Sequence, residues 1–348
     1  MALQRVISPA ATDTQDEHAG WALRPERLSE YVGQRETLER LAIAVEAARS
    51  RGEALDHVLL HGPPGLGKTT LAHVIAAEMG TKVHVTSGPA ISRGTDLVAA
   101  LTRLEAGDVL FIDEIHRTPA AVEEFVYPAM EDFRVDVTLD AGLNARTVQI
   151  KCKPFTLIGA TTRAGLLSAP LRSRFGLIHH LRFYEVDELA AIVERSAGLL
   201  GLGINASAID AIATRSRGTP RIANRLLRRV RDFASVRADG VASSDAVDQA
   251  LALEGVDALG LDELDRNYLK TIGTTYKGGP VGLEALAATM NEDPGTLEDM
   301  IEPFLLKRGF VARQRRGREL TEAGAAHVGV SAPLHHEADE HEGDLFDG

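Results

Sequence analysis

Short apolar runs alternate with helical patterns through the first half of the chain. The apolar runs are residues 58–60, 83–85, 109–112 and 155–158. Between the first two runs, Leu71, Val74 and Ile75 recur at helical spacing. Short apolar runs separated by helical stretches are typical of an α/β domain with a parallel sheet. We therefore predict an α/β fold in which these four runs form buried strands.

The pattern changes after Tyr184. Residues 185–257 show only helical spacing and are rich in Ala, Leu and Arg. Residues 258–330 contain three amphipathic helical stretches followed by a short basic β-like segment. One of these stretches has a stripe at i, i+3, i+4, i+7 and i+8, which predicts a helix facing a core; its members are Leu297, Met300, Ile301, Phe304 and Leu305.

The two ends of the chain lack any such periodicity. Residues 1–21 contain scattered polar residues, and residues 331–348 carry six carboxylates without Lys or Arg. We predict a flexible N-terminal tail and a solvated acidic C-terminal tail. The predicted organisation is therefore a large α/β domain (22–184), a small helical domain (185–257) and a third domain (258–330) between the tails.

Composition narrows the class of protein. The chain has 348 residues, of which 44% are hydrophobic and 25% charged, as expected for a soluble globular protein. The net charge is −12 (38 basic against 50 acidic), so any DNA contact must come from a local basic patch. The single cysteine, Cys152, cannot form an internal disulfide. No apolar run approaches the roughly 20 residues of a membrane span, and a signal peptide is not evident. We expect a cytoplasmic protein.

Residues 62–69 read Gly-Pro-Pro-Gly-Leu-Gly-Lys-Thr and fit the phosphate-loop pattern between a strand and a helix. Gly65 and Gly67 let backbone N–H groups surround phosphate oxygens without Cβ clashes. Lys68 would reach the β- and γ-phosphates, and the Thr69 hydroxyl would bind Mg²⁺. The segment predicts an ATP site.

A second apolar strand ends in Asp113 and Glu114, about 45 residues after the phosphate loop. Asp113 would hold Mg²⁺, and Glu114 would orient and polarise the attacking water. These two carboxylates predict that ATP is hydrolysed rather than only bound.

Three further features favour a motor ATPase of the AAA+ class over a switch or a small-molecule kinase. The strand 155–160 leads into Thr161 and Thr162, whose hydroxyls would contact the γ-phosphate or water. Arg172 and Arg174 follow shortly after, and an arginine supplied by a neighbouring subunit would stabilise the transition state of ATP hydrolysis. Arg221 lies at a helix start, just after Pro220, where it would fold back on the nucleotide.

With these motifs in order, the sequence resembles the RuvB family of bacterial Holliday-junction branch-migration ATPases. The resemblance runs from about residue 22 to 330. The residues that carry it are 23–25, 31–34, 62–69, 110–117, 127–133, 155–163, 172–176, 217–226 and 278–283.

The resemblance implies roles for individual residues. It places Leu23 and Arg24 at the adenine end and makes Thr162 the first sensor, with Thr161 as the alternative. It makes Arg174 a finger acting in trans and Arg221 the second sensor, in a hexameric ring. Further residues implied at the nucleotide are Gly65, Lys68, Thr69, Thr70, Glu131, Asp132, Phe133 and Tyr184.

The segment 134–152 predicts a β-hairpin. Val135, Val137 and Leu139 alternate in one arm, and Val148, Ile150 and Cys152 alternate in the other, joined by the loop 140–145. An exposed two-stranded hairpin is only marginally stable in water, so it usually has a partner. The resemblance implies docking on the junction-binding protein RuvA, with a RuvC-type resolvase as a further possible partner. The alternative is a hairpin packed on its own domain.

The third domain resembles a winged helix. Its acidic helix carries Glu298, Asp299 and Glu302, which would repel phosphates. The basic segment after Lys307 has the opposite charge, and its residues Arg313, Arg315, Arg316 and Arg318 are the candidate DNA ligands. Contacts to phosphates would give salt-dependent affinity with little sequence preference. The alternative is a solvated basic strand.

Three other functions fit parts of the pattern. A clamp-loader-like ATPase would share the ATP site but respond to a sliding clamp. A protein unfoldase would need an aromatic pore loop, and the basic segment disfavours it. A DNA-binding module without hydrolysis is disfavoured by the full set of carboxylates and arginines.

Overall fold

The computed structural model describes residues 21–138 and 147–331, so the two predicted tails and the hairpin tip lie almost wholly outside the described residues. The chain divides into two compact units, residues 1–254 and 255–348. None of the helices in the described part of the chain is long and apolar enough to cross a membrane.

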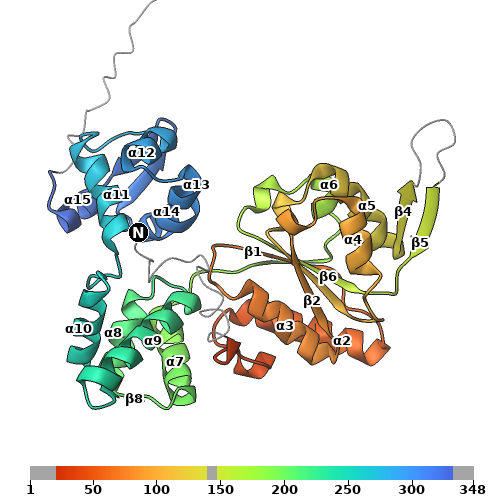
Figure 1. Ribbon diagram of the computed structural model, residues 1–348, viewed down its shortest axis with the longest axis horizontal. Helices are drawn as coiled ribbons and strands as arrows, with labels where there is room; N and C mark the ends of the chain where they lie inside the picture. Colours follow the sequence, from red (N-terminus) through yellow and green to blue (C-terminus); the bar gives the residue numbers. More distant parts are fainter. Residues whose placement is uncertain (1–20, 139–146, 332–348) are drawn as a thin grey trace, which may run out of the picture. The chain divides into compact units, whose positions relative to one another are not determined.

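A five-stranded sheet forms the centre of the first unit (Figure 1). Each pair of neighbours is parallel, which confirms the predicted α/β class. The strand order is β2-β3-β6-β1-β7. The strands are β1 (Val58–His61), β2 (Val83–Ser87), β3 (Val109–Asp113), β6 (Thr156–Thr161) and β7 (Leu177–His180).

Two details of the sheet differ from the prediction. The run 83–85 was expected to be buried, but β2 is an edge strand and Val85 is 56% exposed. The strand β7 was not predicted, because it lies at the other edge and its sequence has only two apolar residues before His179 and His180. Edge strands need only one covered side, so they lack the continuous apolar run that marks β1 and β6.

Helices cover both faces of this sheet, giving three layers. Figure 1 shows α2 (Arg35–Arg51) and α3 (Lys68–Met79) on one face. The other face carries α4 (Gly94–Leu101), α5 (Ala120–Asp132) and the short α6 (Ala169–Arg172). The α4 and α5 side packs a large apolar core against β3 and β6. Short 3-10 turns lie at Leu28–Glu30, Gly88–Ala90, Ile115–Arg117 and Ala164–Leu166.

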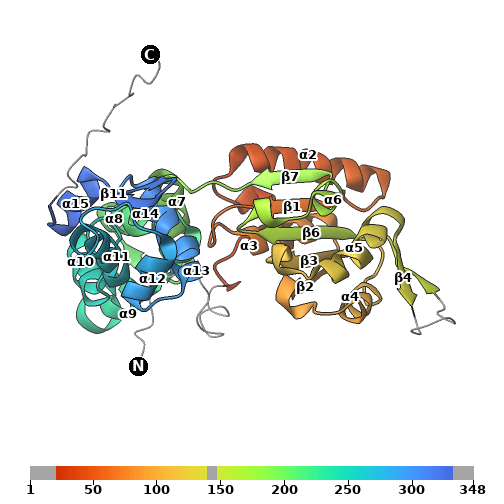
Figure 2. The ribbon, with the colours of Figure 1, turned by 90° about the horizontal axis from the view of Figure 1, so that it is seen from above.

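The predicted hairpin is present. Its arms are β4 (Arg134–Thr138) and β5 (Thr147–Lys151), which pair antiparallel with Val135 opposite Ile150. Val135 is fully buried and Cys152 packs on the same core, whereas Val148 is 41% exposed. The hairpin therefore packs on its own domain at its base and projects beyond the sheet (Figure 2).

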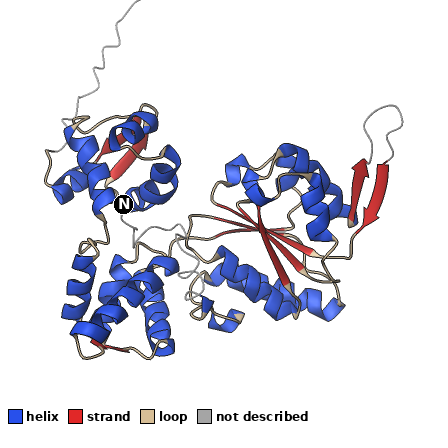
Figure 3. Cartoon of the chain, viewed as in Figure 1, coloured by secondary structure: helices blue, strands red, loops and turns tan. Residues whose placement is uncertain are grey.

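A helical subdomain completes the first unit. Its helices are α7 (Val186–Leu199), α8 (Ala206–Arg215), α9 (Pro220–Arg237) and α10 (Ser244–Leu253). The prediction of a purely helical segment misses one small feature, the two-residue strands β8 (Gly203–Ile204) and β9 (Val241–Ala242), which pair in parallel. Figure 3 shows this subdomain as almost entirely helical.

The second unit has the winged-helix architecture that was predicted, with helices followed by a two-stranded antiparallel wing. The predicted apolar stripe is confirmed, because Leu297, Ile301, Phe304 and Leu305 are buried. The final short helix was not predicted. The elements are α11 (Glu263–Thr274), α12 (Leu283–Met290), α13 (Pro294–Thr296), the π-helical turn η5 (Leu297–Ile301), α14 (Glu302–Lys307), β10 (Val311–Gln314), β11 (Gly317–Leu320) and α15 (Glu322–Val328).

Candidate functional site

The phosphate loop lies at the carboxyl edge of the sheet. It directly follows β1. The neighbouring strand β6 ends in Thr161, and β3, on the far side of β6, ends in Asp113. The N–H of Gly62 donates to the carbonyl of Thr161 over 3.2 Å, which ties the loop to the strand beside it. Because parallel strands end at one edge, residues far apart in sequence meet here. Thr69 and Thr70 lie in the first turn of α3, directly after the loop.

Two loop glycines are required by close approaches. Gly62 has φ +142°, and a Cβ there would lie 2.4 Å from the carbonyl oxygen of Leu181. Gly67 has φ +95°, and its Cβ would lie 2.5 Å from the Tyr31 hydroxyl. No larger side chain fits at either position without moving backbone or a buried tyrosine.

Lys68 is buried, with 8% of its surface exposed. Its ammonium donates to the carbonyls of Gly62 and Pro63 over 2.8 and 2.9 Å. Burial lowers its pKa to about 8, against the opposing effect of the carboxylates Asp113 and Glu114 nearby. The amine is thus held inside the loop, within the field of both predicted catalytic acids.

Glu114 follows β3 in a left-handed backbone conformation, φ 47°. Its N–H donates to Asp113 Oδ1 over 2.9 Å, which holds the Asp113 carboxylate against the Glu114 backbone. The Glu114 carboxylate binds Arg117 at 2.8 Å and remains 41% exposed. Asp113 therefore ends the strand, and Glu114 follows it with a partly exposed carboxylate.

The two candidate sensor threonines are in different environments. Thr161 is 1% exposed, and its hydroxyl is hydrogen-bonded to His116 Nδ1 at 2.8 Å and accepts from the N–H of Arg163 at 3.0 Å. Thr162 is only partly buried. The Thr161 hydroxyl thus has two partners within the chain. The role of His116 was not recognised from the sequence.

The helical subdomain contacts the phosphate loop through the first turn of α9. The N–H of Arg221 donates to the carbonyl of Gly65 over 3.4 Å, so α9 starts directly against the phosphate loop. Leu23 is also fixed to this subdomain, since its carbonyl accepts from Arg195 over 2.8 Å. The guanidinium of Arg24 lies over the Trp21 ring at 3.8 Å.

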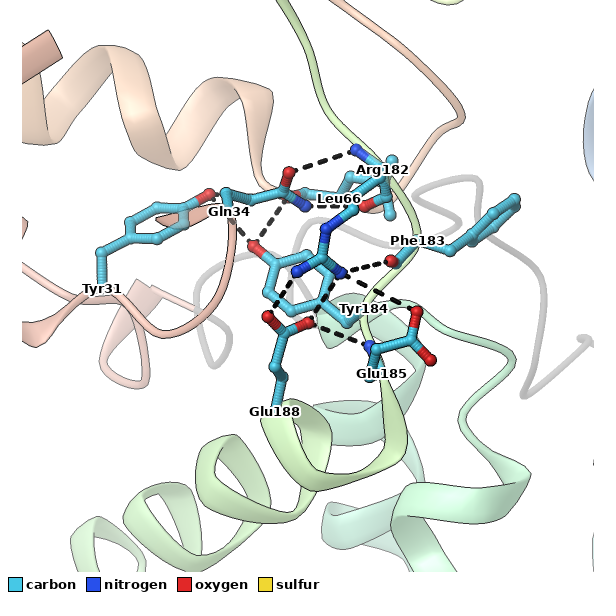
Figure 4. Close-up of polar contacts among 8 residues, drawn as sticks. All are labelled: Tyr31, Gln34, Leu66, Arg182, Phe183, Tyr184, Glu185 and Glu188. Atoms are coloured by element: carbon cyan, nitrogen blue, oxygen red, sulfur yellow. Dashed lines mark hydrogen bonds and ion pairs between the residues drawn. The ribbon is translucent and has the colours of Figure 1, made fainter. Parts of the chain in front are cut away.

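Tyr184 connects the same subdomain to the loop (Figure 4). Its hydroxyl donates to the carbonyl of Leu66 over 3.3 Å and lies 3.4 Å from the hydroxyl of Tyr31. Burial raises the pKa of both phenols, that of Tyr31 to about 12. Both hydroxyls are therefore neutral donors at physiological pH. A Cβ on Gly33 would lie 2.6 Å from the Tyr184 ring.

Three more residues secure this junction, and the sequence alone indicated no role for them. The side-chain amide of Gln34 donates to the carbonyl of Arg182 over 2.6 Å and accepts from its N–H over 3.1 Å. Arg182 in turn makes a bidentate pair with Glu188 at 3.0 and 2.7 Å. Gln34 belongs to the 31–34 motif, which was the only available signal.

The remaining predicted nucleotide residues lie elsewhere. Phe133 packs against Phe155 and His57, with ring centroids 5.8 and 6.5 Å away. Phe155 directly precedes β6 and His57 directly precedes β1, so both mark the end of the sheet at which these parallel strands begin. Glu131 and Asp132 come just before Phe133, and Arg174 pairs with Glu131 at 3.1 Å.

The two sets are therefore separated within one chain. The four residues of β1 span about 13 Å at the usual strand rise. The Lys68 set lies at one end of this strand, and the set of Glu131, Asp132, Phe133 and Arg174 lies at the other. The structure does not bring the second set to the chain's own phosphate loop.

The basic segment forms the hairpin β10–β11, and its arginines fall into two groups. Arg315 and Arg316 form the two-residue turn and are exposed. Arg318 is 13% exposed and binds Glu302 through Nε at 2.7 Å and Nη2 at 3.2 Å. Arg313 is 46% exposed and binds the same carboxylate.

Glu302 is fully buried, so the expectation that it would repel phosphates from the surface is wrong. It also accepts from the Tyr268 hydroxyl at 2.8 Å. Although burial alone raises its pKa, the hydrogen bonds from Arg318, Arg313 and Tyr268 hold the pKa below its usual value. Its charge is directed inward, at the arginines of the wing.

Models of three domain families match consecutive parts of the chain. The RuvB Holliday junction DNA helicase P-loop domain matches residues 23–181, the RuvB AAA lid domain 184–257 and the RuvB C-terminal winged helix domain 258–329.

Individual relatives agree with these matches. The Holliday junction branch migration complex subunit RuvB of Desulfosudis oleivorans is 56% identical over 326 residues, covering 93% of this chain and 95% of that protein. A solved structure of the Thermotoga maritima RuvB Holliday junction branch migration motor is 52% identical with a TM-score of 0.82, covering 90% of this chain and 100% of that one. A proline-to-glycine variant of the same protein gives 0.84 at 52% identity, covering 89% and 100%.

With a phosphate loop, paired carboxylates, an AAA lid and a winged helix in one chain, and with these matches along nearly its full length, the chain belongs to the RuvB family of P-loop AAA ATPases.

Proposed function

We propose that this protein is the ATP-driven subunit of a ring that moves Holliday junctions along DNA during recombination and repair, together with a RuvA-type partner. The observation that carries the proposal is a phosphate loop beside paired carboxylates, in a chain that also has a winged helix with an exposed basic turn and is 56% identical to a branch-migration subunit. The corresponding domains are 22–184, 185–257 and 258–330.

Within the ATP site, each residue has a task set by its position. Lys68 would exchange its loop carbonyls for the β- and γ-phosphates, which offer a buried ammonium a full negative charge. Thr69 and Asp113 supply the oxygen donors that Mg²⁺ prefers, and the ion would offset phosphate charge when bound with ATP. Glu114 would orient the attacking water, and Thr162 and Arg221 would contact the γ-phosphate.

The separation between the two sets of nucleotide residues supports a ring. Arg174 lies at the sheet edge opposite the phosphate loop, so it would reach only a neighbour's ATP. Glu131, Asp132 and Phe133 would border that same neighbouring nucleotide. A head-to-tail contact of this kind closes into a ring, and the family points to a hexamer.

The two exposed hairpins would make the partner contacts. The β4–β5 hairpin would dock on a RuvA-type protein beyond its packed base, with a RuvC-type resolvase joining the same complex. In the winged helix, Arg315 and Arg316 would contact DNA phosphates, with help from Arg313. We assign Arg318 to holding the wing, because it is mostly buried against Glu302.

The test is ATP hydrolysis and branch migration of a synthetic four-way junction with RuvA. Lys68→Ala should abolish both, and normal migration by this variant would refute the proposal. Stimulation by a sliding clamp instead of RuvA would support a clamp-loader-like ATPase. Unfolding of a substrate protein without DNA would support an unfoldase.

A further inference from the structure

The side chain of Arg174 is held by its own subunit on three sides. Its guanidinium lies over the Tyr127 ring at 4.5 Å from the centroid. Nη1 donates to the carbonyl of Pro170 over 2.7 Å, and Nη2 pairs with Glu131 at 3.1 Å. Only 22% of the side chain is exposed. A free surface arginine would sample many rotamers, but this one is confined to a defined position.

Tyr127 is itself held by a partly buried network of hydrogen bonds. Its hydroxyl donates to Glu123 Oε2 over 2.8 Å and lies 3.1 Å from the Ser168 hydroxyl. Ser168 donates to the same Glu123 oxygen over 2.6 Å, and Glu123 is 8% exposed. Ser168 also caps α6 by accepting from the N–H of Leu171. One network thus joins the ring under Arg174 to the helix that presents Pro170.

The three α5 residues involved share one face of that helix. Glu123, Tyr127 and Glu131 are each four residues apart, so their side chains lie in a row. Glu123 is buried, Tyr127 presents its ring to Arg174, and Glu131 is 54% exposed. An exposed ion pair contributes little and is readily exchanged, whereas a cation–π contact grows stronger as water is excluded.

We propose that Tyr127 is the positioning residue of Arg174: its ring fixes the guanidinium, while Glu131 is a counter-ion that a neighbour's phosphate displaces. The inference rests on the proposed action of Arg174 in trans. Tyr127 lies against Arg174, in the set of residues that is separated from the chain's own phosphate loop, so its loss should lower turnover at the neighbouring site and leave ATP binding at its own site intact.

Three variants distinguish the effect of the Tyr127 aromatic ring from the effect of an apolar side chain of similar size. Tyr127→Leu keeps an apolar side chain without a ring and should lower the ATP turnover of assembled rings about 5- to 30-fold. Tyr127→Phe keeps the ring and should lose less than about threefold. Phe125→Leu removes a ring from the same helix, where it packs on the core and not on Arg174, and should match the unaltered protein. Binding of a fluorescent ATP analogue should stay within about twofold in all three.

Mixed rings give the decisive readout. Tyr127→Leu subunits keep an intact ATP site, and Lys68→Ala subunits keep an intact Arg174. Equimolar mixing should raise turnover per Tyr127→Leu subunit, as it should for Arg174→Ala subunits treated in the same way. A purely structural defect would gain nothing from mixing.

The outcomes distinguish this inference from the function it rests on. If Arg174→Ala gains on mixing but Tyr127→Leu does not, or if Tyr127→Leu is as active as Phe125→Leu, Tyr127 does not position the arginine. If Arg174→Ala itself gains nothing, the trans role fails and the inference fails with it. Should Tyr127→Leu not fold, Tyr127→Met carries the same expectations.

Discussion

Replacing Glu302 with glutamine should loosen the β10–β11 wing while leaving the ATPase unit unchanged. The carboxylate is fully buried and accepts hydrogen bonds from Arg318, Arg313 and Tyr268. A glutamine amide would keep one acceptor oxygen but would turn an NH₂ group toward a guanidinium. The wing would then contain a mostly buried arginine without its counter-ion.

The magnitude follows from which bonds are lost. A hydrogen bond to a charged group contributes about 1.5–3 kcal/mol, and losing one partner of a buried pair costs more than losing a surface pair. Arg313 is 46% exposed, so its share is discounted for solvent screening. We expect about 2–4 kcal/mol in the local stability of the wing, mainly through Arg318.

Native-state hydrogen exchange measures this directly, because it reports local opening of the hairpin amides. Protection of residues 311–320 should fall about 30- to 700-fold, whereas amides of α3 in the other unit should not change. Glu298→Gln is the matched control. Glu298 is 33% exposed and lies 3.7 and 3.8 Å from the same two arginines, so its loss should cost a few tenths of a kcal/mol, about the value of a surface pair.

Equal loss of protection in Glu302→Gln and Glu298→Gln would refute this reasoning.

The pH dependence of hairpin protection gives a second check on the unaltered protein. Since the pKa of Glu302 is lowered in the folded state, its stabilisation is present above the ordinary glutamate pKa and is lost as the pH falls through the folded value. Hairpin protection should therefore hold at neutral pH and decline only in acid below pH 4.5.

Three further predictions concern the ATP site and the wing. Burial lowers the pKa of Lys68 to about 8, whereas bound phosphates favour its ammonium form. ATP affinity should therefore fall as the pH rises through 8, and ATP binding should be accompanied by proton uptake. Calorimetry in buffers of different ionisation enthalpy measures this uptake, and its absence would contradict the prediction. Gly33→Ala should lower the melting temperature and ATP affinity more than Gly52→Ala. Both glycines have φ near +70°, so an alanine at either would be strained by about 1–3 kcal/mol, but only the Cβ at position 33 would clash with the Tyr184 ring. Equal effects of the two substitutions would contradict the proposed steric role of Gly33. Arg316→Ala should weaken DNA binding equally across sequences and reduce the salt slope by about 1; an unchanged slope would remove Arg316 from the interface.

The chemistry of the ATP site was largely predictable from local sequence. The phosphate loop needs glycines, a lysine and a threonine in one short segment between a strand and a helix, so a single window contains the whole signal. Asp113 and Glu114 were equally accessible, because they end an apolar strand about 45 residues after the phosphate loop. The main strands and the apolar stripe at 297–305 followed from periodicity, which depends only on burial of one face or run.

The edges of elements were harder to predict. The strand β7 and the exposed Val85 of β2 both lie at sheet edges, where a strand is covered on fewer sides and its sequence carries less apolar signal. Pairing partners were also hidden. Glu302 looked like a surface acid because its helix carries other acids, yet its position in the three-dimensional fold is buried against arginines that follow it in the chain.

The sequence by itself determined which chemical groups are present and which of them share a strand end or a helix face, because those relations are set by backbone geometry over a few residues. Only the tertiary structure decided which groups meet across longer separations: Arg221 against Gly65, Gln34 against Arg182, and Arg174 at the sheet edge opposite Lys68. The physical reason is that such contacts depend on strand order and on the packing of helices around the sheet, and no local pattern of residues encodes either one directly.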